Sequence, residues 1–180
     1  MRELYKENLW NKIHEEINSL KNDESMKGFF KKNVLDFDNL TDSITYIISN
    51  KLINDDMSES NIIVNIREAF LDDGILIAIE EDINEVFKKD PACNYLFQPL
   101  LFYKGFHSIT AYRVANYWLN EKPSFSMYIQ SIVSEKFNVD IHPNAKIGKG
   151  IMVDHASGVV IGETAKIGDY SSLFHVVTLG

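Results

Sequence analysis

The chain has 180 residues, a hydrophobic fraction of 45% and a formal net charge of −8 at pH 7. Length and composition are those of a globular protein with a buried core. The acidic balance argues against a nucleic-acid partner, because there is no excess of basic residues to neutralise phosphates.

Stripes of apolar residues at helical spacing run through the chain from residue 1 to about 137. Helices are expected near residues 9–20 and 40–52, and a third helix follows possible N-caps at Ser58 and Ser60. The third and fourth stripes consist of Ile62, Ile63, Ile66, Ala69 and Phe70, and of Ile75, Ile79, Ile83, Val86 and Phe87. Pro91 is expected to end the fourth helix.

The segment 99–119 is apolar on nearly every side, which predicts one central, buried helix. One line along this helix consists of Phe102, Phe106, Ile109 and Tyr112. Pro123 can open a further helix that runs to about Phe137. These elements together predict an all-α domain over residues 1–137.

The rhythm changes near Val139, where aliphatic residues begin to recur every six positions. The first series is Ile141, Ile147, Val153 and Val159, and the second, shifted by two residues, is Ile161, Ile167, Leu173 and Leu179. Small residues follow at corner positions: Ala145, Ser157, Ala165 and Ser171. A period of six is typical of a left-handed parallel β-helix built from hexapeptide repeats, in which short strands form the sides of a triangular prism. The shift predicts an irregular corner near residues 159–161.

The predicted fold class is therefore α+β, with the helical domain followed by a β-helix over residues 138–180. Each coil needs three six-residue sides, so about two coils are present. Repeat arrays usually need three or more units, and the sequence stops at "VTLG", on a hexad. We therefore expect the chain to be the front part of a longer protein.

The N-terminal stretch "MRELYKENLW" lacks the apolar region of a signal peptide, and no apolar run is as long as a membrane span. The single cysteine, Cys93, cannot form an internal disulfide and has no neighbouring basic residue, so it is interpreted as uninvolved in chemistry. A cytoplasmic protein without a membrane partner is the expectation.

Asp140, Asp154 and His155 lie in a stretch that needs only small and aliphatic residues for packing. Asp140 and His155 are separated by slightly less than one coil, so they could approach each other on successive coils. A carboxylate bonded to one imidazole nitrogen leaves the other free to accept a proton from a hydroxyl nucleophile. Simpler interpretations stay open, namely surface polarity for the Asp-His pair and a turn role for Asp140.

Other polar residues are open to more than one interpretation. Glu163 is either a solvated turn residue or a site carboxylate, and Asp90, in "KKDPAC", is on its own a helix-end residue. The remaining candidate histidines are interpreted as structural: His107, His142 and His175. Their spacing lacks the compact pattern of metal ligands, so no metal is expected.

The stretch "VDIHPNAKIGKGIMVDHASGVVIGETAKIGD", followed by "VTLG", resembles the catalytic core of the serine O-acetyltransferase family. The helical half is similar too, through "LWNKIHEEI", "NIREAF", "KDPACNYLFQPLLFYKGFHSITAYRVANYWL" and "SEKFNVDIHP". The resemblance covers essentially the whole chain. It implies transfer of an acetyl group from acetyl-CoA to the hydroxyl of L-serine, which gives O-acetylserine for cysteine biosynthesis.

By this resemblance His155 is the general base and Asp140 the carboxylate that orients it. Asp90 and Asp154 would contact the amino acid, with Asp90 suited to its ammonium group, and Glu163 would be a further acidic site residue. Acetyl-CoA would act as a co-substrate, with no cofactor bound tightly.

The resemblance also implies a homo-oligomer, a trimer or a dimer of trimers, with active sites between neighbours. L-cysteine would inhibit at the serine site, and O-acetylserine sulfhydrylase would bind the full-length form. The groups that grip the substrate carboxylate, and most of the acetyl-CoA groove, are expected in coils beyond Gly180. A truncated, non-catalytic assembly or regulatory subunit, or another hexapeptide acyltransferase, remains the alternative.

Overall fold

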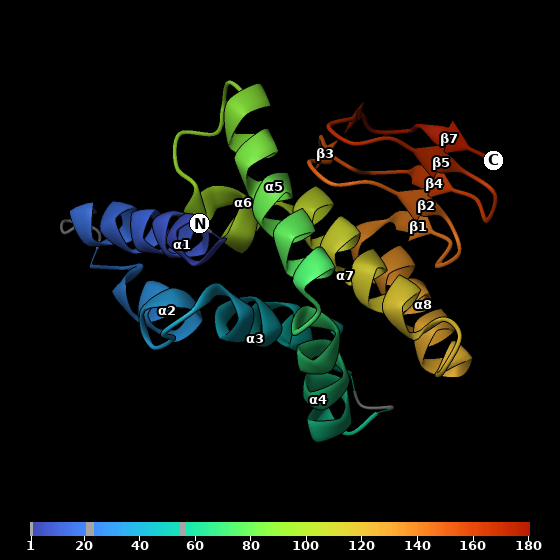
Figure 1. The fold of residues 1–180 in the computed structure, drawn as a ribbon, viewed down its shortest axis with the longest axis horizontal. Helices are drawn as coiled ribbons and strands as arrows, with labels where there is room; N and C mark the ends of the chain where they lie inside the picture. Colours follow the sequence, from blue (N-terminus) through green and yellow to red (C-terminus); the bar gives the residue numbers. More distant parts are fainter. Residues whose placement is uncertain (1, 21–23, 55–56) are drawn as a thin grey trace.

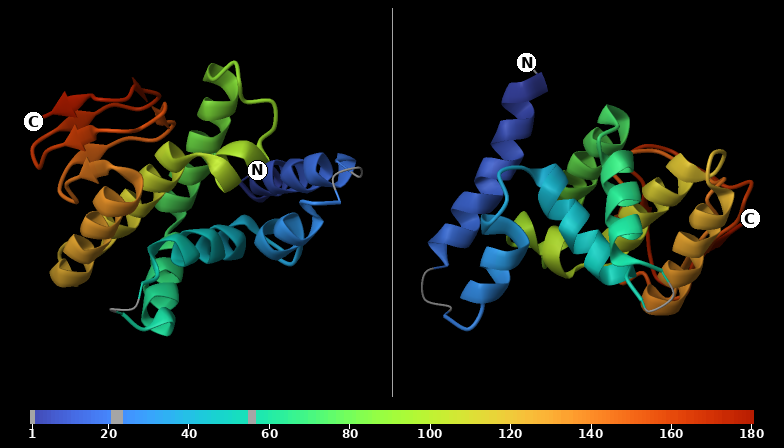
Figure 2. Two further views of the ribbon diagram at one scale, coloured as in Figure 1. Left: turned by 180° about the vertical axis from the view of Figure 1, so that it is seen from behind. Right: turned by 90° about the horizontal axis from the view of Figure 1, so that it is seen from below.

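The computed structural model describes residues 2–20, 24–54 and 57–180, and a helical part is followed by a stack of short strands (Figure 1, Figure 2). The helical part contains α1 (Arg2–Ser19), α2 (Lys27–Phe30), the π-helical turn η1 (Lys31–Leu35), α3 (Leu40–Leu52), α4 (Glu59–Phe70), α5 (Asp73–Lys89), α6 (Phe97–Phe102), α7 (Lys104–Trp118) and α8 (Pro123–Phe137). The strands are β1 (Val139–Ile141), β2 (Lys146–Ile147), β3 (Met152–Val153), β4 (Val159–Ile161), β5 (Lys166–Ile167), β6 (Ser172–Leu173) and β7 (Thr178–Leu179). The predicted α+β class is confirmed. No helix in the described ranges is both long and apolar enough to cross a membrane.

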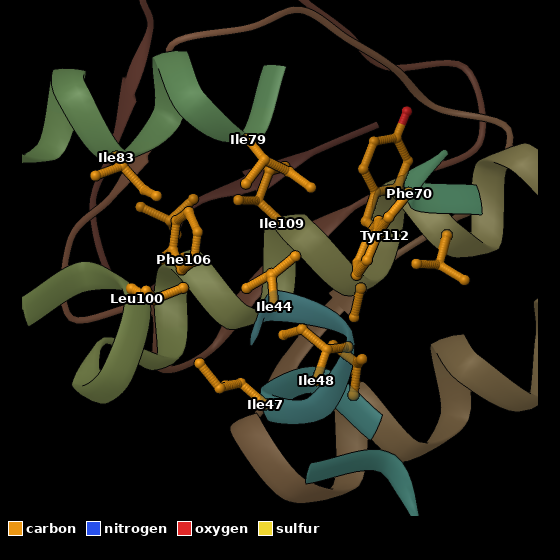
Figure 3. Close-up of a cluster of buried hydrophobic side chains, with 14 of the residues drawn as sticks. Ile44, Ile47, Ile48, Phe70, Ile79, Ile83, Leu100, Phe106, Ile109 and Tyr112 are labelled. Atoms are coloured by element: carbon orange, nitrogen blue, oxygen red, sulfur yellow. The ribbon is translucent and has the colours of Figure 1, made fainter. Parts of the chain in front are cut away.

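The core of the helical part is built around α7 (Figure 3). Ile79 and Ile83 of α5 lie on one side of Ile109 of α7, and Ile44 and Ile48 of α3 lie on the other. All five side chains are almost completely buried. Burial of one such side chain contributes about 1.5–3 kcal/mol, so this cluster fixes how α3, α5 and α7 pack.

The prediction of one helix over residues 99–119 is wrong at its N-terminal end. The backbone of Tyr103 is extended, with φ −90° and ψ 110°, and it separates α6 from α7. The break turns Phe102 outward, to 48% exposure, so this residue does not share the buried line of α7. Phe87, which belongs to the predicted stripe of α5, is also 41% exposed. The rest of the prediction holds, since α7 is buried on nearly all sides.

Each strand of the second coil lies parallel to a strand of the first. β1, β4 and β7 form one side of the prism, β2 and β5 the second, and β3 and β6 the third. The hexad residues Ile141, Val153, Ile161, Ile167 and Leu173 are buried, as the six-residue period predicts. The strands therefore stack the aliphatic hexads into one continuous core.

The two-residue shift lies a few residues earlier than predicted. Val153 pairs with Leu173, while Val160 pairs with Thr178. Six residues separate Val153 from Val160, but only four separate the matching positions in the second coil. The two extra residues therefore belong to the turn between β3 and β4, because residues 159–161 are themselves the regular strand β4.

A buried ion pair holds the helical part to the prism. Asp82 of α5 is fully buried, and its Oδ2 accepts hydrogen bonds from Nε and Nη2 of Arg113 in α7, at 3.1 and 2.7 Å. Its Oδ1 accepts a third bond from the backbone N–H of Ile151, at 2.7 Å. Arg113 also donates to the carbonyl of Gly148, at 2.9 Å. The pair therefore joins two helices to one corner of the prism.

His107 should make the protein less stable as the pH falls. Burial, with a smaller contribution from the charge of Lys51, lowers the pKa of His107 to about 3, and its Nε2 lies 2.9 Å from the carbonyl of Leu100. An unfolded histidine has a pKa of about 6.5, so the unfolded state binds the proton first. Stability is then full above that pH and falls below it, by up to about 1.4 kcal/mol per pH unit. Urea unfolding between pH 7 and pH 5 should show this extra slope in the unaltered protein and not in His107→Gln, which cannot titrate. Equal slopes in the two proteins would contradict the assignment.

Candidate active site

A cavity of about 520 Å³ opens where the end of α5, the beginning of α7 and the β3–β4 turn meet. The residues that line it include Asp90, Tyr103, Lys104, Gly105, Asp154 and His155. Three of the five predicted site residues, Asp90, Asp154 and His155, thus lie together, although they come from two distant parts of the chain.

Asp90 reaches the cavity because α5 ends there. Its backbone is extended, with φ −86° and ψ 108°, and Pro91 follows, as the sequence predicts. Its Oδ1 accepts a hydrogen bond from the backbone N–H of Ala92, at 2.8 Å. Lys89, one residue earlier, donates to the carbonyl of Tyr170 at 2.7 Å and so ties this helix end to the prism. Asp90 is therefore a helix-end residue and a cavity carboxylate at once.

The turn between β3 and β4 carries Asp154 and His155 in a strained backbone. His155 and Ala156 have φ of 56° and 58°, an uncommon conformation for residues with a side chain. The N–H of Ala156 bonds to the carbonyl of Asp154 at 2.6 Å, and that of Ser157 to the carbonyl of His155 at 2.7 Å. These are two consecutive three-residue turns. Backbone strain of this kind costs on the order of 1–3 kcal/mol per residue and is common at functional sites.

The imidazole of His155 is open to solvent and close to a carboxylate. Its side chain is 76% exposed, and its Nε2 lies 3.8 Å from Oδ2 of Asp154, which is too far for a hydrogen bond. The ring is therefore free to accept a proton from a molecule in the cavity.

Asp140 does not bond to His155 in the described part of the chain. It lies in β1 beside Val160, and its Oδ1 accepts a hydrogen bond from Nε2 of Gln130 at 2.7 Å. The two residues do flank the same corner, because the N–H of Gly158 bonds to the carbonyl of Asn138 at 2.8 Å. Asp140 and His155 are thus near each other on successive coils, but no direct hydrogen bond joins them.

Glu163 lies outside the cavity. It is exposed in the turn between β4 and β5, where Asn144 Nδ2 lies 3.4 Å from its Oε1. This is a different corner of the prism from the one that carries His155. Within one chain, Glu163 and His155 therefore cannot act on the same small molecule.

Tyr103 also lines the cavity and was not predicted from the sequence. Burial raises the pKa of Tyr103. Its hydroxyl bonds to Cys93 and Asp90, whose negative charges raise this pKa further. Cys93 packs with Val86 and Met152, which line the cavity, and burial raises the pKa of its thiol. A protonated thiol is a poor nucleophile, which agrees with an uninvolved Cys93.

His175, interpreted from the sequence as structural, lies beside the site: its ring centroid is 6.0 Å from that of His155, in an edge-to-face arrangement. The first coil is 20 residues long, since Ile141 pairs with Ile161, and His155 and His175 differ by the same number. The coil length was thus the signal that could have placed His175 there. No group of three or more His, Cys, Asp or Glu side chains within the described ranges could hold a metal ion.

Comparison with known proteins places the chain in a family. The model of the family "Serine acetyltransferase, N-terminal" matches residues 9–111. The serine acetyltransferase of Buchnera aphidicola subsp. Acyrthosiphon pisum is 44% identical over 175 residues, which is 96% of this chain and 64% of that protein. The chain belongs to the serine acetyltransferase family. It spans just under two thirds of the length of this relative.

Solved structures of serine acetyltransferases share the fold. One in complex with CoA superimposes with a TM-score of 0.93 at 38% identity. The match covers 97% of this chain and 75% of that chain. The enzyme of Neisseria gonorrhoeae in complex with serine has a TM-score of 0.90 at 36% identity, over 95% of this chain and 72% of its own. The resemblance seen in the sequence is thereby confirmed at the level of family and fold.

Proposed function

We propose that the protein is a serine O-acetyltransferase, which transfers the acetyl group of acetyl-CoA to the hydroxyl of L-serine and releases O-acetylserine and CoA. The observation that carries the proposal is the convergence of Asp90, Asp154 and His155 in one cavity of a chain from this family. Acetyl-CoA acts as a co-substrate, no cofactor is bound tightly, and the product enters cysteine biosynthesis in the cytoplasm.

The cavity suits a zwitterionic amino acid. It is lined by the C-terminal end of α5 and the N-terminal end of α7. The first carries partial negative charge and the second partial positive charge. The carboxylates of Asp90 and Asp154 add negative charge to the cavity lining, which suits the serine ammonium group.

His155 acts as the general base. Its neutral imidazole takes the proton of the serine hydroxyl while the hydroxyl oxygen attacks the thioester carbonyl carbon of acetyl-CoA. The C–S bond then breaks, and the departing CoA thiolate takes up a proton. The exposure of the His155 ring and its position beside Asp154 support this role.

Asp140 and Glu163 are carboxylates outside the cavity of one chain. We propose that Asp140, which flanks the same corner as His155, orients its imidazole and that Glu163 adds a further negative charge, as the family resemblance implies. Glu163 lies at a different corner, so a trimer or dimer of trimers would have to bring the Glu163 of a second prism against the corner that carries His155.

The remaining properties follow the family as well. The organisation proposed is a helical oligomerisation domain, residues 1–137, and the start of a catalytic domain, residues 138–180. The acetyl-CoA groove and the grip on the substrate carboxylate belong to further coils, L-cysteine inhibits at the serine site, and O-acetylserine sulfhydrylase binds the full-length form.

A second candidate is a non-catalytic assembly or regulatory subunit. It is favoured by the helical part, which contributes most of the buried hydrophobic side chains of the described residues. Co-expression with a longer serine acetyltransferase and a pull-down would reveal a mixed oligomer. Absence of any mixed oligomer would remove this candidate.

The test of the main proposal is CoA release from acetyl-CoA, with and without L-serine. We expect no release from the 180 residues alone, and serine-dependent release when the remaining coils of the Buchnera relative are joined after Gly180. Release that depends on a sugar or an antibiotic amine, with L-serine inactive, would contradict the proposal.

A further inference from the structure

The turn that carries His155 needs support from outside itself. Two consecutive residues with side chains, His155 and Ala156, adopt positive φ. Such a conformation persists only where the surroundings hold it in place. The contacts that hold this turn therefore also determine where the His155 ring lies.

Helix α7 contacts the turn at its beginning. Gly105 packs so closely against the end of β3 that a Cβ atom at this position would lie 2.0 Å from the carbonyl oxygen of Val153. No side chain fits there, so glycine is required for this approach. Val153 directly precedes Asp154, and the approach fixes the point at which the turn starts.

Helix α7 also contacts the turn near its end. Nζ of Lys104 donates a hydrogen bond to Oγ of Ser157. Both side chains are only half-buried, and the bond spans 53 positions of the sequence. The backbone of Ser157 is held from its other side, since its carbonyl accepts a bond from the N–H of Val176 at 2.9 Å.

We propose that Lys104 and Gly105 form a clamp that holds the strained turn, and that Lys104 is a positioning residue for His155. Gly105 sets the start of the turn and Lys104 sets its end, so the imidazole between them stays at the mouth of the cavity. The contact also explains why the helix breaks at Tyr103, since the break lets Lys104 begin α7 against the prism. The clamp is inferred from contacts alone, whereas its role in catalysis rests on the proposed function.

The experiment measures backbone hydrogen exchange and the imidazole NMR signals of the unaltered chain and its variants. Lys104→Met keeps most of the side-chain length and removes the donor. We expect the amides of Ala156 and Ser157 to exchange at least about tenfold faster, and the close contact between the His155 and His175 rings to disappear. Lys104→Arg keeps a charged donor and should restore both signals. Lys166→Met, on an exposed side of the prism away from the cavity, is the matched control and should change neither.

A second variant covers the case in which Lys104→Met fails to fold. Ser157→Ala removes the acceptor and leaves Lys104 in place, and the same loosening of the turn is expected. Unchanged exchange and an unchanged ring contact in either folded variant would overturn the clamp. No substrate enters this experiment. If the chain extended by the coils of the Buchnera relative fails to acetylate serine while Lys104→Met loosens the turn, the proposed function is contradicted and the clamp stands.

Discussion

Replacing His155 with alanine should lower the turnover of serine acetylation by about 10²–10⁴-fold, the usual contribution of a general base. The assay is CoA release at saturating acetyl-CoA and L-serine, in the chain extended by the coils of the Buchnera relative. Because the His155 side chain is 76% exposed, its removal should leave the fold and the melting temperature nearly unchanged. The loss should therefore appear in kcat rather than in the amount of folded protein.

His142→Ala is the control for this experiment. The His142 ring accepts a hydrogen bond from the backbone N–H of Asn144 and lies outside the cavity. Its removal should leave kcat within a factor of about three, which is the size of an ordinary indirect effect. Near-normal turnover of His155→Ala would rule out His155 as the base.

Replacing Arg113 with methionine should destabilise the protein by about 3–5 kcal/mol, because it removes one partner of a buried ion pair. Asp82 would keep the bond from the N–H of Ile151 and would lose both bonds from the guanidinium. Burial already raises the pKa of Asp82, and Arg113 opposes that rise. Without Arg113 the carboxyl would remain buried beside apolar neighbours, with its charge uncompensated or its proton retained.

Urea unfolding at pH 7 measures this loss. The double variant Asp82→Leu with Arg113→Met removes both charges, and it should recover much of the lost stability because no buried charge is left unpaired. Arg67→Met is the matched control, since its ion pair with Asp42 is partly exposed to solvent and should contribute at most about 1 kcal/mol. A loss below about 1 kcal/mol for Arg113→Met would show that the pair does not hold the two parts together.

Features with a local signal were predictable from the sequence. Pro123 begins α8, which ends at Phe137, and the helix expected near residues 40–52 matches the bounds of α3. The six-residue period is enough to identify the prism, because the core of a β-helix repeats with its sides. The two-residue shift in that period marks the corner that carries His155, although the sequence places the shift a few residues too late.

Features that depend on contacts between distant residues were not predictable. The break at Tyr103 has no glycine or proline at that position, and the two residues that follow it, Lys104 and Gly105, contact the distant prism. Asp82 and Arg113 form an ion pair, but no periodic pattern in the sequence predicts that these two residues lie close together. Asp140 bonds to Gln130 of α8 instead of His155, because spacing along the chain gives the coil but not the direction of a side chain.

The cavity between α5, α7 and the β3–β4 turn should bind the amino-acid substrate, and an NMR titration of the chain with L-serine measures this. We expect saturable shifts of the amides around Asp90 and from Asp154 to Ser157, and none with 3-hydroxypropionate, which is serine without the ammonium group. Asp90→Asn should bind L-serine at least about tenfold more weakly. Shifts confined to another surface, or equal binding by Asp90→Asn, would show that this cavity does not bind the amino acid through Asp90.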